Sequence, residues 1–261
     1  MFDYHMHSLV SRDGESSGAQ MAAHAAGLGL REICFTDHID YIPDPTLADW
    51  TFATEDYNAA YDHLSFEGLK IRRGIEFGLL PNNRDGLKEE LRRRPFDFVI
   101  GSVHFAQDVD VYGAAFWEGR PAHETEMRYL EDVLKCIRIH DDFDVLGHIT
   151  VLGKVRYNPN NYPMPYDDHR ELLDEIFRVL IQKGKGLEVN TSGKDRCGGF
   201  LPTAEYLQRF KELGGEIVTV GSDAHYAHKV GQYCMEASRM IADIFGYVCT
   251  FADRQPIFHK L

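Results

Sequence analysis

The chain has 261 residues, of which 44% are hydrophobic and 26% are charged, and its formal net charge is −13. This composition supports a folded core and argues against long disordered tracts. No apolar stretch of about 18 residues predicts a membrane span, and the acidic balance excludes the broad basic surface that nucleic-acid binding needs. The five cysteines are scattered and form no CxxC motif. We therefore expect reduced thiols and a cytoplasmic protein, with Cys197 the most exposed thiol because it lies in a glycine-rich loop.

Predicted strands and helices alternate along the chain. The strands are expected at 2–5, 32–36, 69–75, 96–101, 143–147, 186–190 and 216–221, and the helices at 18–28, 54–66, 84–94, 122–140, 167–183, 203–213 and 229–246. The helix at 167–183 is the clearest, since Leu173, Ile176 and Leu180 fall on one face and Gly184 follows as a stop signal. This alternation favours one α/β domain over residues 1–261, a distorted TIM-like (β/α)7 barrel, with a doubly wound open sheet as the alternative.

Side chains that can bind metal ions or transfer protons lie at the ends of the predicted strands. His5 and His7 end the first strand, where residues two apart point to the same face. The later strand ends supply Asp37, His38, Glu76, His104, His148, Asp223 and His225, and the sixth strand contains Glu188 and Asn190. Because the carboxyl ends of barrel strands converge on one mouth, we expect these residues to form one site. The remaining histidines are predicted to be surface or packing residues: His24, His63, His123, His140, His169, His259 and His228, the last being nearest to the mouth.

The selected set is rich in imidazole and carboxylate and contains no cysteine. Such donors suit Zn, Mn or Fe rather than a thiolate-rich structural zinc site. The set exceeds the needs of one ion, so we expect two or three divalent transition-metal ions, with Glu76 as the natural bridge between two of them. Ser/His/Asp catalysis is a competing interpretation, since Ser102 and Ser222 lie near the mouth. Neither serine sits in a GxSxG motif, and this kind of catalysis would not explain the many histidines at the strand ends.

Seven motifs, HxH, FTDH, GIEFG, GSVHF, VLGH, EVNTSG and GSDAH, occur in an order that resembles the PHP (polymerase and histidinol phosphatase) superfamily, and within it the histidinol-phosphatase branch. The resemblance spans nearly the whole chain and implies a distorted TIM barrel, in agreement with the predicted elements. It also implies up to three ions, held by His5, His7, Glu76 and Asp223, by Glu76, His104 and His148, and by Asp13, His38 and His225. Asp13 stands where some relatives carry histidine, and its segment SRDGESSG is also typical of an Asp-Gly turn.

The resemblance further implies a phosphate-binding site, here called the phosphate grip, made by arginines that follow the VLGH and NTSG motifs. Arg156 and Arg196 are the candidates, with Lys194 as a further cation, although the spacing departs slightly from the family pattern in both loops. Thr150 stands where an aspartate is common, and either arginine could instead be a solvated surface charge. Asp37 is expected to orient its neighbour His38 rather than to bind a metal.

Together with the predicted cluster, the resemblance implies an enzyme, a metal-dependent histidinol-phosphatase of histidine biosynthesis that hydrolyses L-histidinol phosphate by attack of a metal-activated hydroxide on phosphorus. Glu76, Asp223 and His225 are its predicted catalytic residues, and Asp223 or His225 could protonate the leaving group. The alternatives are a PHP phosphoesterase for another small phosphate, a nuclease, a non-catalytic metal-binding module, and an amidohydrolase, for whose carboxylated lysine no candidate is evident. The expected partner is a small phosphorylated substrate, without nucleic acid or membrane, and the oligomeric state is left open.

Overall fold

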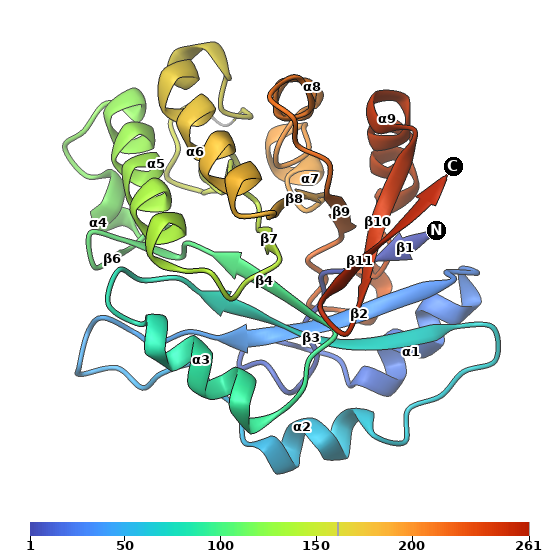
Figure 1. Ribbon diagram of the computed structural model, residues 1–261. Coiled ribbons are helices and arrows are strands. Elements are labelled where there is room, and N and C mark those ends of the chain that lie inside the picture. The colour runs from blue at the N-terminus through green and yellow to red at the C-terminus, as the bar shows by residue number, and fades with distance from the viewer. Residues whose placement is uncertain (161, 261) are drawn as a thin grey trace.

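The computed structural model of the protein describes residues 1–160 and 162–260. Within them, parallel strands form one seven-stranded sheet in the order β1-β2-β3-β4-β7-β8-β9 (Figure 1). These strands are β1 (Phe2–Asp3), β2 (Glu32–Ile39), β3 (Lys70–Gly78), β4 (Phe98–Ser102), β7 (Val145–Leu146), β8 (Gly186–Asn190) and β9 (Val218–Gly221). The last strand returns to the first, where the amide of Tyr4 donates to the carbonyl of Val220 at 2.9 Å and the amide of Asp223 to that of His5 at 2.7 Å. The distorted (β/α)7 barrel is confirmed, and the open sheet was the wrong alternative.

Helices surround the barrel on its outside (Figure 1). The longer ones are α1 (Gly18–Gly27), α2 (Thr54–Tyr61), α3 (Arg84–Arg93), α5 (Ala122–Ile139), α6 (Arg170–Gln182), α8 (Ala204–Glu212) and α9 (Cys234–Phe245). Short helical turns lie at α4 (Ala114–Trp117), η1 (Val151–Lys154), η2 (Asp167–His169), α7 (Lys194–Cys197) and η3 (Ala227–Lys229). Helix α6 buries Leu173, Ile176 and Leu180 as its sequence pattern predicts. None of the helices in residues 1–160 and 162–260 combines the length and the apolar character of a membrane span.

Two hairpins complete the fold at opposite ends of the barrel. The first, β5 (Phe105–Ala106) with β6 (Val109–Asp110), follows the carboxyl end of β4 and therefore belongs to the mouth. The second, β10 (Tyr247–Ala252) with β11 (Gln255–Lys260), covers the amino ends of the strands. There Arg254 donates from Nε to Asp144 at 2.5 Å, and its amide donates to the carbonyl of Asp97 at 2.9 Å. The second hairpin thus closes the end of the barrel that lies away from the mouth, and we call it the hairpin plug.

Several details differ from the sequence-based expectation, among them the two hairpins, the shorter first strand and the three that follow. Strands β2 and β3 continue as a pair to Ile39 and Phe77, so His38 and Glu76 lie inside strands rather than beyond them. Helix α9 begins at Cys234 and not at 229, because Tyr233 has a left-handed backbone (φ 59°) that a helix cannot contain. The prediction that Cys197 is exposed was wrong: only 8% of its surface is accessible, and its thiol donates to the carbonyl of Gly193.

The hairpin plug generates a stability prediction. Phe251 is 2% exposed, and its ring packs 4.8 Å from that of Phe98. Phe251→Ala should lower the free energy of unfolding by about 3–5 kcal/mol, because it removes buried apolar surface and leaves a cavity. Urea denaturation monitored by circular dichroism measures this loss. Phe258→Ala is the matched control, since Phe258 on β11 is 48% exposed and should cost less than about 1 kcal/mol. Equal losses in both variants would contradict the assignment of the plug to the core.

Candidate metal centre

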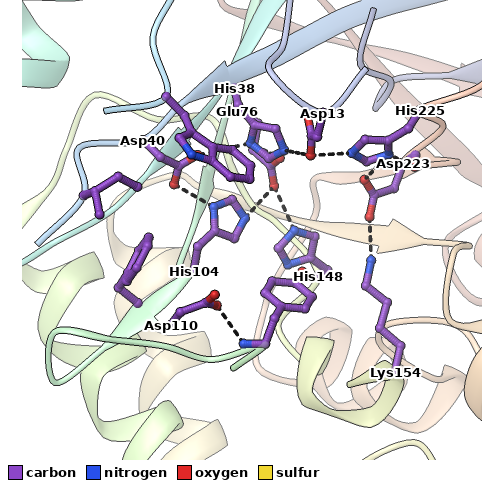
Figure 2. A pocket seen from close by; sticks show the side chains of 14 residues that line it. Asp13, His38, Asp40, Glu76, His104, Asp110, His148, Lys154, Asp223 and His225 are labelled. Carbon is purple, nitrogen blue, oxygen red and sulfur yellow. Dashed lines mark hydrogen bonds and ion pairs between the residues drawn. The ribbon is translucent and has the colours of Figure 1, made fainter. Parts of the chain in front are cut away.

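Glu76 lies at the centre of the candidate site (Figure 2). It is buried in β3, and its two carboxylate oxygens face different imidazoles. Oε1 lies 2.8 Å from Nε2 of His148 and 3.3 Å from Nε2 of His104. Oε2 faces the other side, at 3.2 Å from Nε2 of His5, 3.5 Å from Nε2 of His7 and 3.2 Å from Nδ1 of His38. A carboxylate with its oxygens divided in this way is placed to bridge two ions.

Two further carboxylates lie at the edge of the imidazole cluster. Oδ2 of Asp13 lies 3.0 Å from Nε2 of His225 and 3.5 Å from Nε2 of His38. Oδ1 of Asp223 lies 3.4 Å from Nε2 of His7. The backbone of Asp223 is left-handed (φ 56°), a conformation that aspartate tolerates better than most residues. The structure thus brings together all nine predicted ligands: His5, His7, Asp13, His38, Glu76, His104, His148, Asp223 and His225.

The donor atoms group as a multinuclear site requires. Atoms within 4.8 Å of one another come from His7, Asp13, His38 and His225, from His5, His7 and Asp223, from His5, Glu76 and His148, and from His38, Asp40 and His104. The groups overlap with the three predicted ligand sets but share His5, His7 and His38 more widely. Asp40 is the addition, and the sequence analysis missed it. Its signal was its spacing, because Asp40 directly follows β2 and lies two residues after His38, so in an extended chain both side chains point to the same side.

A second row of carboxylates orients the imidazoles from outside. Oε1 of Glu188 lies 2.5 Å from Nδ1 of His5, and Oδ1 of Asp40 lies 2.7 Å from Nδ1 of His104. A carboxylate at Nδ1 favours the tautomer with its proton there, which leaves the Nε2 lone pair for a metal. Glu188 was noted in its strand but was given no role as a ligand or catalytic residue, because its contact with His5 is visible only when β8 is placed beside that ring.

Asp37 acts through a serine rather than directly on the ring of His38. Its Oδ1 accepts a hydrogen bond from Oγ of Ser11 at 3.1 Å, and its Oδ2 accepts one from Tyr61 at 2.5 Å. The same Ser11 oxygen accepts from the backbone amide of His38 at 2.9 Å and lies 3.4 Å from Nδ1 of His7. Asp37 therefore fixes the segment that presents both imidazoles.

The electrostatics of the cluster favour ionised carboxylates. Burial acts to raise the pKa of Glu76, but the imidazoles of His5 and His104 outweigh it and hold the pKa well below its usual range. Burial acts to lower the pKa of His104, but Asp40 and Glu76 outweigh it and raise that pKa to about 10. Burial, helped by neighbouring imidazoles, lowers the pKa of His7 to about 3. Buried anionic groups of this density need positive charge beside them.

The donor chemistry fits divalent ions. The residues offer imidazole nitrogens and carboxylate oxygens, the mixture preferred by Zn, Mn and Fe. Oδ1 of Asp13 is buried and has no hydrogen-bond partner within residues 1–160 and 162–260. The Nε2 atoms of His5 and His7 lie 3.0 Å apart and point at one another. Two neutral imidazoles have at most one proton between them at such a contact, so at least one nitrogen lone pair faces it. Two or three ions bound between these atoms would satisfy both features.

The cluster forms the floor of a cavity of about 310 Å³, which we call the mouth pocket (Figure 2). Its lining is Asp13, His38, Asp40, Ile42, Trp50, Glu76, His104, Phe105, Asp110, Tyr112, His148, Lys154, Asp223 and His225. A second hollow, here called the basic hollow, shares Tyr112, Lys154, Asp223 and His225 with the mouth pocket and adds Val155, Arg156, Ser192 and Arg196. The two predicted arginines therefore lie beside the candidate metal centre.

Lys154 connects the two cavities and was missed by the sequence analysis. Its Nζ lies 2.7 Å from Oδ2 of Asp223 and 2.7 Å from Oγ of Ser192. The 3-10 turn η1 aims this side chain into the site, and the sequence KVRY alone does not distinguish it from Arg156. Lys194, by contrast, is not brought to the basic hollow: its Nζ lies 2.5 Å from Oε1 of Glu236 and 4.8 Å from the centre of the Phe200 ring.

The remaining histidines lie apart from the cluster. His228 lines a different surface hollow together with Met1 and His24, so it does not reach the mouth. His140 is buried against the carbonyl of Leu80 at 2.8 Å, and His169 is buried against Glu126 at 2.8 Å. Position at or near the carboxyl end of a barrel strand, rather than histidine content, separates the candidate ligands from these packing residues.

A barrel that gathers imidazoles and carboxylates at the carboxyl ends of its strands is typical of metal-dependent enzymes, hydrolases among them. A profile of the PHP domain matches residues 3–192, and the chain belongs to this family.

Several known proteins are similar to this chain. Histidinol-phosphatase of Lactococcus lactis subsp. lactis is 33% identical over 233 residues, which cover 87% of this chain and 85% of that protein. A probable histidinol-phosphatase of Clostridium acetobutylicum is 28% identical and covers 92% of both chains. The crystal structure of the Lactococcus histidinol phosphate phosphatase, complexed with zinc, L-histidinol and phosphate, superposes with a TM-score of 0.84 at 28% identity over 98% of both chains.

The candidate centre predicts metal-dependent stability. Ions that bind only the folded state stabilise it by mass action, by about 4 kcal/mol at a thousandfold excess over Kd. Removal of metal with a chelator should therefore lower the melting temperature, and Zn or Mn should restore it. Calorimetry and elemental analysis measure the two effects. His148→Ala should reduce the metal content, whereas His63→Ala, which alters an exposed histidine, should not. Equal metal content in both variants would contradict the centre.

Proposed function

We infer that the protein is a metal-dependent phosphomonoesterase that hydrolyses L-histidinol phosphate to L-histidinol and phosphate. The observation on which this depends is the likeness over 98% of the chain to a structure of histidinol phosphate phosphatase that contains zinc, L-histidinol and phosphate. The assembled cluster supports it, because a set of candidate ligands sufficient for several ions gathers at the mouth of this barrel. The sequence-based expectation of a phosphatase agrees with both findings.

The proposed metal ligands are the nine residues of the cluster, with Asp40 as a further donor. His5, His7 and Asp223 would hold one ion, His104 and His148 a second, and Asp13, His38 and His225 a third, with Glu76 between the first two. The ions, when bound, would lower the pKa of a coordinated water towards about 7 and neutralise charge on the phosphate. Glu188 and Asp40 would keep His5 and His104 in the orientation and tautomer that binding needs.

The chain's own residues would bind the phosphate and move protons. Hydrolysis forms a bond from a water oxygen to phosphorus and breaks the bond from phosphorus to the histidinol oxygen, which leaves as an alcohol once it takes a proton. We propose that Asp223 or His225 passes a proton from the attacking water to that oxygen, since both line the mouth pocket and the basic hollow. Lys154, Arg156 and Arg196 would stabilise the phosphate oxygens, because charge-assisted hydrogen bonds to phosphate are among the strongest in proteins.

We propose that one domain spanning residues 1–261 has this activity and that the protein functions in the cytoplasm. The described residues support the first proposal, because both hairpins pack on the same barrel. The cysteines support the second: Cys34, Cys136, Cys197, Cys234 and Cys249 are all buried as free thiols, which suits a reducing compartment.

The first test of the proposed function is a substrate panel. Wild-type protein with Zn or Mn should release phosphate from L-histidinol phosphate with a higher kcat/KM than from other phosphomonoesters, and chelators should silence it. Glu76→Gln should lower kcat by at least about 1,000-fold, because the bridging charge is lost while the shape is kept. Phosphate release measures both effects. Full activity after exhaustive metal removal, or a near wild-type rate in Glu76→Gln, would overturn the proposed mechanism.

A second test concerns the cations beside the centre. Lys154→Ala, Arg156→Ala and Arg196→Ala should each lower kcat/KM by about tenfold or more, because each removes a charge that faces the phosphate. Lys194→Ala should have the smallest effect of the four cations, since Glu236 already engages that ammonium group. Arg92→Ala serves as a control, because Arg92 lies exposed on α3. Steady-state kinetics at fixed ionic strength separates these results, and losses equal to that of the control would contradict the proposed phosphate grip.

A further inference from the structure

The hairpin β5–β6 forms one wall of the mouth pocket. Phe105 and Asp110 are direct partners in its antiparallel pairing, so their side chains lie on the same face of the hairpin. Both residues line the mouth pocket. The hairpin is held firmly, because the amide of Val111 donates to the carbonyl of His104 at 3.0 Å and the amide of Gln107 donates to Asp132 at 2.5 Å. A phenyl ring and a carboxylate are therefore presented together at a fixed place above the centre.

The carboxylate of Asp110 retains capacity for a ligand. Its Oδ1 accepts a hydrogen bond from the backbone amide of Tyr112 at 2.8 Å. Within residues 1–160 and 162–260, no lysine, arginine or histidine nitrogen lies within the 4.0 Å of an ion pair with it. The proposed metal ligands do not include it, and in the described part of the chain its carboxylate has a neutral backbone amide as its hydrogen-bond partner. A charged oxygen at the edge of the cavity is thus left for a hydrogen-bond donor from outside the chain.

Apolar and aromatic side chains surround the same part of the pocket. Ile42 and Trp50 come from the loop between β2 and α2, and Tyr112 follows the hairpin. Trp50 is fixed by two backbone hydrogen bonds with Asp40, of 2.9 and 2.8 Å. Its ring lies 5.8 Å from that of His38, and the Tyr112 ring lies 6.4 Å from that of His104. Aromatic faces beside a carboxylate favour flat rings and cations.

The opposite part of the pocket has the reverse charge. In Figure 2, Asp110 lies to the left of His148 and Lys154 to its right. Lys154 also lines the basic hollow, where Arg156 and Arg196 add two more cations. A phosphate dianion is repelled by Asp110 and attracted by Lys154, whereas an ammonium or imidazolium group is subject to the opposite forces. The cavity therefore distinguishes the two ends of a substrate that has a phosphate at one end and a cation at the other.

We propose that Asp110, with Trp50, Phe105 and Tyr112 around it, is the specificity-determining subsite for the amine-bearing leaving group of the substrate. Asp110 receives the ammonium or ring N–H, and the aromatic side chains contact the heterocycle. The subsite selects phosphate esters of small amino alcohols with an aromatic ring over sugar phosphates, which present no cation. This inference rests on the proposed function and deepens it, because it explains how the phosphatase centre chooses its ester.

The test compares Asp110→Asn with wild type on two substrates, L-histidinol phosphate and p-nitrophenyl phosphate, an ester whose leaving group carries no cation. Asparagine keeps an oxygen for the Tyr112 amide and removes only the charge. The ratio of kcat/KM for L-histidinol phosphate to that for p-nitrophenyl phosphate should fall by about tenfold or more, mainly through KM, because one charge-assisted contact is lost. Asp108→Asn is the matched control, since Asp108 is an exposed carboxylate in the turn of the same hairpin and does not line the pocket.

The outcomes separate the subsite from the proposed function. An equal loss on both substrates would overturn the subsite and assign Asp110 to the support of the hairpin. An unchanged ratio, or the same fall in Asp108→Asn, would also overturn it while leaving the phosphatase proposal intact. A wild-type protein that hydrolyses p-nitrophenyl phosphate but not L-histidinol phosphate would instead overturn the proposed substrate, and the subsite with it. A selective rise in the KM for L-histidinol phosphate in Asp110→Asn supports the subsite.

Discussion

The division of the Glu76 carboxylate between two groups of imidazoles is the constraint on which the rest of the site depends. One oxygen faces His104 and His148, and the other faces His5 and His7. A buried carboxylate is costly unless positive charge and hydrogen bonds compensate it. The barrel meets this requirement because its strands deliver ring nitrogens from several directions to one point. Glu76, whose buried charge is costly to the fold, is therefore also the residue that can bridge two ions.

The positions of these rings depend on groups that touch no substrate. Glu188 reaches from β8 to His5, Asp40 reaches His104, and Asp37 holds Ser11 beside His7. Each contact joins parts of the chain at least 26 residues apart in sequence, so the barrel and its site form one structure. The hairpin plug at the other end closes the amino ends of the strands through Phe251. Packing there maintains the strand arrangement that the ligands at the mouth need.

The sequence predicted the barrel and the cluster because both follow from local patterns. Alternating elements indicated the fold, and His148 or Asp223 could be placed at a strand end without knowledge of their neighbours. Asp40 and Lys154 were missed because their roles arise from contacts across the barrel, to His104 and Asp223. The expectation for Cys197 failed for a related reason: glycine-rich sequence predicts a loop, but only the fold shows that Gly193 and its surroundings cover the thiol.

The protein is strongly acidic overall, yet its proposed substrate is an anion. The local arrangement of charge resolves this conflict, because carboxylates inside the cluster attract divalent ions, and bound ions reverse the sign of the potential at the mouth. Lys154 extends that positive region towards Arg156 and Arg196, while Asp110 leaves one side of the pocket negative. The net charge of −13 then repels anions from the rest of the surface. An ester with a phosphate at one end and a cation at the other is the kind of molecule for which both signs are useful.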